Sequence, residues 1–101
     1  MDGDRIEYVL AVTVNGRRLQ RVIIDQHYRG KHGAVVNDDL ILELVAELNG
    51  QTFPVQAQRG DFQYFAVEPI YRERSPYRLV LVICITDDYL GVINAVRVKR
   101  R

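Results

Sequence analysis

The stretch over residues 25–50, DQHYRGKHGAVVNDDLILELVAELNG, constrains the fold most, because it is the only part of the chain whose pattern predicts helices. Its second half repeats apolar residues at intervals of three and four, the spacing of an amphipathic helix, at Leu40, Ile41, Leu44, Val45 and Leu48. Asn37 can cap this helix, and Asn49-Gly50 ends the pattern. We expect a helix over 38–48 that covers one face of a sheet.

The first half of this stretch predicts a second, shorter helix that carries both histidines, His27 and His32. Asp25 stands where a carboxylate can accept a backbone N–H of the first turn. Gly30 interrupts the segment, and Gly33 can close it in a left-handed conformation. We therefore expect one or two turns at most.

The rest of the chain predicts strands. Residues 6–14 and 17–24 flank Asn15-Gly16, the strongest short signal for a hairpin turn. Pairing Val14 with Arg17 places Val12 opposite Leu19 and Tyr8 opposite Ile23, with the turn end in solvent. Alternation predicts further strands over 62–68 and 89–99, and a near-continuous apolar run predicts a central strand over 77–86. Pro69 ends the first of these strands or marks a sheet edge.

Together these elements predict one domain, residues 1–101, of the α+β class. We expect an N-terminal β-hairpin, two helices of which the first is short, and three antiparallel strands, all forming one sheet with the helices on one face. The opposite face would stay open. It would present a shallow, partly basic groove lined by Tyr64, Arg78, Arg97 and Lys99.

Composition limits the function classes. With 14 basic and 13 acidic residues the net charge is +1, so nucleic-acid binding would rest on local clusters. The single cysteine, Cys84, lies in an apolar run, which indicates a buried residue and fits a reducing compartment. No leader and no membrane-length apolar run is seen, so we expect a cytoplasmic protein without membrane contact. No metal-binding motif occurs, and we expect no cofactor.

Acid/base chemistry is the main catalytic hypothesis. His27 and Lys31 share a helix face, whereas His27 and His32 diverge by about 140°, which argues against a shared metal. Histidine can take and give a proton near neutral pH, and RNA cleavage by its own 2′-hydroxyl needs a base, an acid and cations. We predict His27, His32, Lys31 and Arg97 as catalytic residues. The alternatives are a capping or packing role for His27 and a helix-dipole partner role for His32.

Aromatic and basic residues predict a substrate-binding set. Tyrosines interleaved with arginine suit stacking on unpaired bases and binding of phosphate, although each tyrosine has the alternative of lying at the edge of the core. Asn94 has two readings, as a base-binding group or as a partner for the backbone at a bulge. The predicted set is Tyr28, Tyr64, Tyr77, Arg78, Asn94 and Lys99, with Tyr71 and Tyr89 as further aromatics.

The order of elements resembles the RelE/ParE and BrnT-like toxin superfamily of small metal-independent ribonucleases. The resemblance covers residues 21–99. It depends on HYRGKHG before NDDLILELVAELNG, and on YRLVLVICI followed by YLGVINAVRVKR. It implies catalytic candidates at His27, Lys31, His32, Arg78 and Arg97. The N-terminal hairpin and the near-neutral charge depart from the family pattern.

The leading prediction is thus a toxin-like endoribonuclease that cleaves RNA by metal-independent acid/base catalysis. Its expected partners are RNA and a cognate antitoxin or other protein, with a homodimer as a further option. The alternative is a noncatalytic small regulator or phage-type inhibitor that binds another protein through its exposed sheet and hairpin edge. Clustering of His27, Lys31 and Arg97 would favour the first, and their dispersal the second.

Overall fold

The computed structural model describes residues 4–32 and 35–99, and for Lys31 and His32 it describes the backbone alone. Its elements in chain order are β1 Arg5–Val14, β2 Arg17–Asp25, the 3-10 helix η2 Gln26–Tyr28, α1 Arg29–His32, α2 Asp38–Ala46, β3 Ala57–Arg59, β4 Phe62–Arg72, β5 Ser75–Cys84 and β6 Tyr89–Arg97. The six strands form one sheet in the order β1-β2-β6-β5-β4-β3. Every neighbouring pair is antiparallel except β2 and β6, which are parallel.

The predicted fold class is wrong. Residues 4–32 and 35–99 are mostly strand, in a six-stranded mixed sheet, and α2, with nine residues, is the one substantial helix among them. The expected first helix is a 3-10 turn that runs into the four residues of α1. Gly30 weakens this segment, and η2 buries a single side chain, Tyr28, so there is too little apolar surface to stabilise a longer helix.

The N-terminal hairpin turns at Asn15-Gly16 with positive φ angles of 54° and 74°, as this turn requires. The predicted pairs Val14–Arg17 and Val12–Leu19 are confirmed. A β-bulge between Val9 and Val12 then shifts the register, and Tyr8 pairs with Val22 instead of Ile23.

The expectation that the turn end projects into solvent is also wrong. Val12, Val14 and Leu19 are buried. The connection after α2 covers this end, because the Asn15 amide donates to the Gln51 carbonyl and the Phe53 amide donates to Asn15 Oδ1. The first half of β1, which contains Ile6 and Val9, is the exposed half of this strand.

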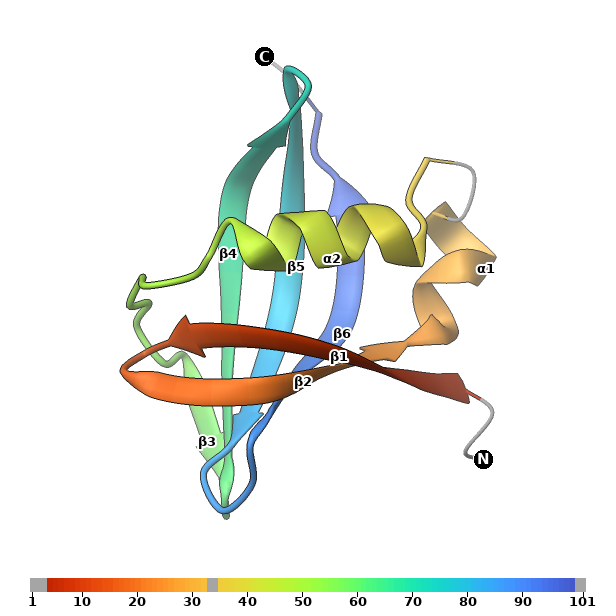
Figure 1. Ribbon diagram of the computed structural model, residues 1–101. Helices are drawn as coiled ribbons and strands as arrows, with labels where there is room; N and C mark the ends of the chain where they lie inside the picture. The colour runs from red at the N-terminus through yellow and green to blue at the C-terminus, as the bar shows by residue number, and fades with distance from the viewer. Residues whose placement is uncertain (1–3, 33–34, 100–101) are drawn as a thin grey trace.

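The β1–β2 hairpin crosses β4, β5 and β6 steeply, and α2 lies across the same three strands (Figure 1). Between these parts lies one core, to which α2 contributes Ile41, Leu44 and Val45 as its pattern predicts. The sheet adds residues from alternate positions, which face α2: Val22, Ile24, Phe65, Leu79, Leu81, Ile83, Leu90 and Val92. The side of the sheet opposite this core is called the outer face below.

The strand that begins at Phe62 continues through Pro69 to Arg72. Its register with β5 shifts between Val67 and Ile70, and β3 pairs with it only as far as Tyr64. Pro69 therefore lies at an irregular sheet edge, where a missing N–H is tolerated, and the edge alternative predicted for it is confirmed. Within residues 4–32 and 35–99, no helix is long and apolar enough to cross a membrane.

Candidate functional site

The candidate site is a hollow of ≈ 450 Å³ on the outer face. Its floor is a row of neighbouring residues across four strands, because Ile23 pairs with Gly91, Gly91 with Val82, and Val82 with Tyr64. Gly91 leaves the floor of the hollow without a side chain at this position. A Cβ built at this position would lie 2.6 Å from Val82 Cγ1, which is too close for a van der Waals contact.

Aromatic side chains wall the hollow. Phe62 and Tyr64 come from β4, and Tyr89 comes from the start of β6. Phe62 is 38% exposed although it is large and apolar. The site is thus an apolar depression on a side of the sheet that α2 does not cover.

Arg5 and Asp25 line the hollow at its β1–β2 end, where they are opposite each other in the strand register. Asp25 also begins η2, since its Oδ1 accepts the His27 N–H at 2.9 Å, as predicted for an N-cap. Opposite charges at adjacent positions leave this end close to neutral.

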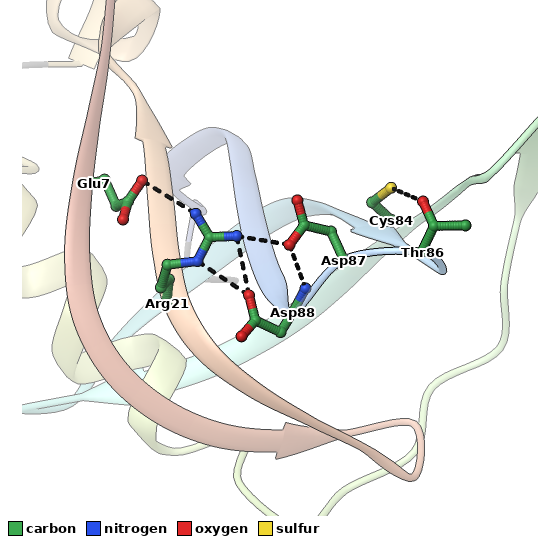
Figure 2. A network of polar contacts seen from close by, with 6 residues as sticks. All are labelled: Glu7, Arg21, Cys84, Thr86, Asp87 and Asp88. Carbon is green, nitrogen blue, oxygen red and sulfur yellow. Dashed lines mark hydrogen bonds and ion pairs between the residues drawn. The ribbon is translucent and has the colours of Figure 1, made fainter.

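A second group of charges surrounds Arg21 beside Tyr89, and we call Glu7, Arg21, Asp87 and Asp88 the Arg21 cluster. Arg21 bonds Glu7 at 3.2 Å, Asp87 at 2.7 Å and Asp88 at 3.0 Å (Figure 2). Its guanidinium carbon lies 5.5 Å from the centre of the Tyr89 ring. The hydrogen bond to Asp88 is the main cause that raises the pKa of Arg21, and the Asp88 backbone N–H does most to lower the pKa of Asp87.

A third polar group is buried at the start of α2. Asp38 is 6% exposed, and its carboxylate accepts hydrogen bonds from Tyr8 Oη at 2.5 Å, Tyr28 Oη at 2.5 Å and Gln26 Nε2 at 3.1 Å. Arg29 Nη2 lies 3.4 Å from Asp38 Oδ1. Burial acts to raise the pKa of Asp38, but these hydrogen bonds and the Arg29 charge outweigh it and lower the pKa. The group joins β1, η2 and α2 and has a structural role.

The predicted catalytic residues are placed as follows. The His27 side chain is 81% exposed, with its Nδ1 3.8 Å from Asp25 Oδ1. The side chains of Lys31 and His32 lie outside the described part of the chain. Arg97 is exposed at the end of β6, where it lines a separate hollow of ≈ 660 Å³ together with Arg74 and Lys99. Arg97 and Lys99 thus line one hollow, but Tyr64 and Arg78, predicted to share a groove with them, do not line it.

The predicted substrate-binding residues are dispersed. Tyr28 is buried and bonded to Asp38, so its ring is not free to stack on a base. Tyr77 is 8% exposed. Arg78 Nε lies 2.8 Å from Glu68 Oε1, and Asn94 Oδ1 accepts the Ala95 N–H at 3.0 Å. Tyr64 alone of these described residues lines the outer-face hollow.

Sequence reasoning did not identify Gly91, Arg5 or Arg21 as parts of a site. A signal for Gly91 was present, because an isolated glycine within a strand pattern indicates a close approach or a bulge. The Arg21 cluster had no local signal, since Asp87 and Asp88 lie 66 and 67 residues away in the chain. Cys84 is buried as predicted, and its Sγ lies 3.3 Å from Thr86 Oγ1 (Figure 2).

Among the described side chains, those of residues 4–30 and 35–99, no group of three or more histidines, cysteines, aspartates or glutamates is placed to hold a metal ion. Comparison with family models, with curated proteins and with solved structures returned no match. The resemblance to the RelE/ParE and BrnT-like superfamily stays a prediction that these comparisons do not test.

Proposed function

We propose that this chain is a protein-binding module that docks a partner on the outer face of its sheet, with an apolar side chain of the partner seated in the hollow over Gly91. One observation carries the proposal: the hollow is apolar, walled by Phe62, Tyr64 and Tyr89, and has no residue of α2 in its lining. A pocket that receives an apolar anchor, with aromatic residues around it, is the usual energetic centre of a protein interface.

The charges near the hollow support a protein partner over RNA. Arg21 is held by three carboxylates, and Arg78 is paired with Glu68. Cations neutralised in this way are poor ligands for a phosphate backbone, whose binding depends on free positive charge. Cleavage of RNA by His27 and Arg97 remains the competing prediction.

A variant comparison tests the proposal. The tagged chain, a Tyr64→Lys variant and a Tyr71→Lys control are each used to retain proteins from an extract of the source cells. Tyr71 is on the same strand and 61% exposed, but it does not line the hollow. We expect a protein that the wild type and Tyr71→Lys retain and that Tyr64→Lys loses, with the same thermal unfolding midpoint in all three chains.

Two outcomes would overturn the proposal. One is equal retention of the same proteins by Tyr64→Lys and by the wild type, which would show that the hollow is not used. The other comes from expressing the wild type and His27→Ala in cells while RNA integrity is followed. Breakdown of RNA by the wild type and not by His27→Ala would establish the ribonuclease instead.

A further inference from the structure

The Arg21 cluster places an excess of negative charge beside one end of the hollow. One guanidinium faces three carboxylates, which leaves two net negative charges. The carboxylates remain accessible to a further partner, because the side chains of Glu7, Asp87 and Asp88 are 51%, 50% and 51% exposed. Each can accept a further hydrogen bond from the solvent side.

Tyr89 connects this charge to the hollow. Its ring lines the hollow and also lies beside the Arg21 guanidinium. Elsewhere the rim is balanced or positive: Arg5 is opposite Asp25, and Arg59 pairs with Phe62 in the register of β3 and β4. Near Tyr89 the three carboxylates of the cluster outnumber the two cations that act on this ring, Arg5 and Arg21, so this end carries a net negative charge.

We infer that the partner segment carries a lysine or arginine beside the apolar side chain that enters the hollow, and that this cation lies near Tyr89 within reach of Asp87 and Asp88. The inference rests on the proposed function and names the chemistry of its ligand. A cation at this end gains from the exposed carboxylates, whereas the Arg21 guanidinium already lies over the Tyr89 ring. A glutamate or aspartate at the same position would be repelled.

Defined peptides test the charge preference. Two blocked hexapeptides, GLFKKG and GLFEEG, are titrated separately into the ¹⁵N-labelled full chain, and the amide shifts of Ile23, Val82 and Gly91 are followed. We expect the lysine peptide to shift these amides and to bind about fivefold or more tightly than the glutamate peptide at low salt. The difference should shrink at about 0.5 M salt, because exposed charges are screened.

A matched pair of variants locates the charge. Glu7→Gln removes one carboxylate of the cluster without altering the turn that holds Asp87 and Asp88. Glu43→Gln is the control, since Glu43 is 52% exposed and bonds Arg72 at 2.9 Å on a different surface. We expect Glu7→Gln to weaken the lysine peptide about twofold or more, and Glu43→Gln to leave it unchanged.

Equal or tighter binding of the glutamate peptide would overturn the inference while leaving the outer face as the docking surface. Absence of shifts at Gly91 with either peptide would also overturn it. The proposed function is judged separately by the retention experiment with Tyr64→Lys, so the two failures are distinguishable.

Discussion

The hydroxyl of Tyr28, in the 3-10 turn after β2, donates a hydrogen bond to the carboxylate of Asp38, in the first turn of α2. Both side chains are almost completely buried. Tyr8 of β1 donates to the second oxygen of the same carboxylate. This contact fixes the start of α2 against the hairpin, so the helix covers the core and leaves the outer face open.

Replacing Tyr28 by phenylalanine should reduce the free energy of unfolding by about 1–3 kcal/mol, because a buried carboxylate then loses one of its donors while the ring still fills the same space. Urea unfolding of the two chains measures this. Tyr71→Phe is the control: Tyr71 is 61% exposed, and its loss of a hydroxyl should change stability by less than about 0.5 kcal/mol. An equal effect of both substitutions would contradict the structural role of the contact.

The lowered pKa of Asp38 predicts acid lability. Because its pKa is lower in the folded than in the unfolded chain, the unfolded state takes up the proton first, and the stabilisation is present at neutral pH and lost as the pH falls through and below about 4. We expect the urea midpoint of the wild type to fall more steeply below pH 5 than that of Asp38→Asn. Parallel pH profiles would show that Asp38 is not responsible.

Gly91→Ala should destabilise the chain by about 1–3 kcal/mol, since the added methyl group meets Val82 Cγ1. Val82→Ala removes that atom. Gly91→Ala should therefore cost much less free energy of unfolding in the Val82→Ala background than in the wild type. A thermodynamic cycle of the two single variants and the double variant measures the coupling, which we expect to exceed about 0.5 kcal/mol. Additive effects would mean that the two side chains do not compete for the hollow.

Arg21→Gln should lower the thermal midpoint of unfolding more at low salt than at high salt. Without the guanidinium, Glu7, Asp87 and Asp88 repel one another, and added salt screens that repulsion. We expect the difference in thermal midpoint between wild type and variant to narrow between about 0.05 M and about 1 M sodium chloride. Arg72→Gln is the control because Arg72 pairs with a single carboxylate, Glu43. If the difference in thermal midpoint between the wild type and Arg21→Gln does not narrow, repulsion among the three carboxylates is contradicted.

Local patterns predicted the elements well where neighbours in the chain decide the structure. The Asn15-Gly16 turn, the Asn37 cap with its bond to the Leu40 N–H, and the apolar face of α2 all follow from residues within about one turn or one hairpin. The first helix was overpredicted because the Asp25 cap suggested a helix, whereas in the 3-10 turn that forms there Tyr28 is the one buried side chain.

The sequence by itself determined which residues turn, cap and alternate, because these preferences depend on local backbone sterics and short-range hydrogen bonds. Only the tertiary structure decided that β2 lies parallel to β6, that Gly91 sits between Ile23 and Val82, and that Arg21 meets Asp87 and Asp88. These contacts join residues far apart in the chain, and they are set by the single arrangement of the sheet that buries its apolar side under α2.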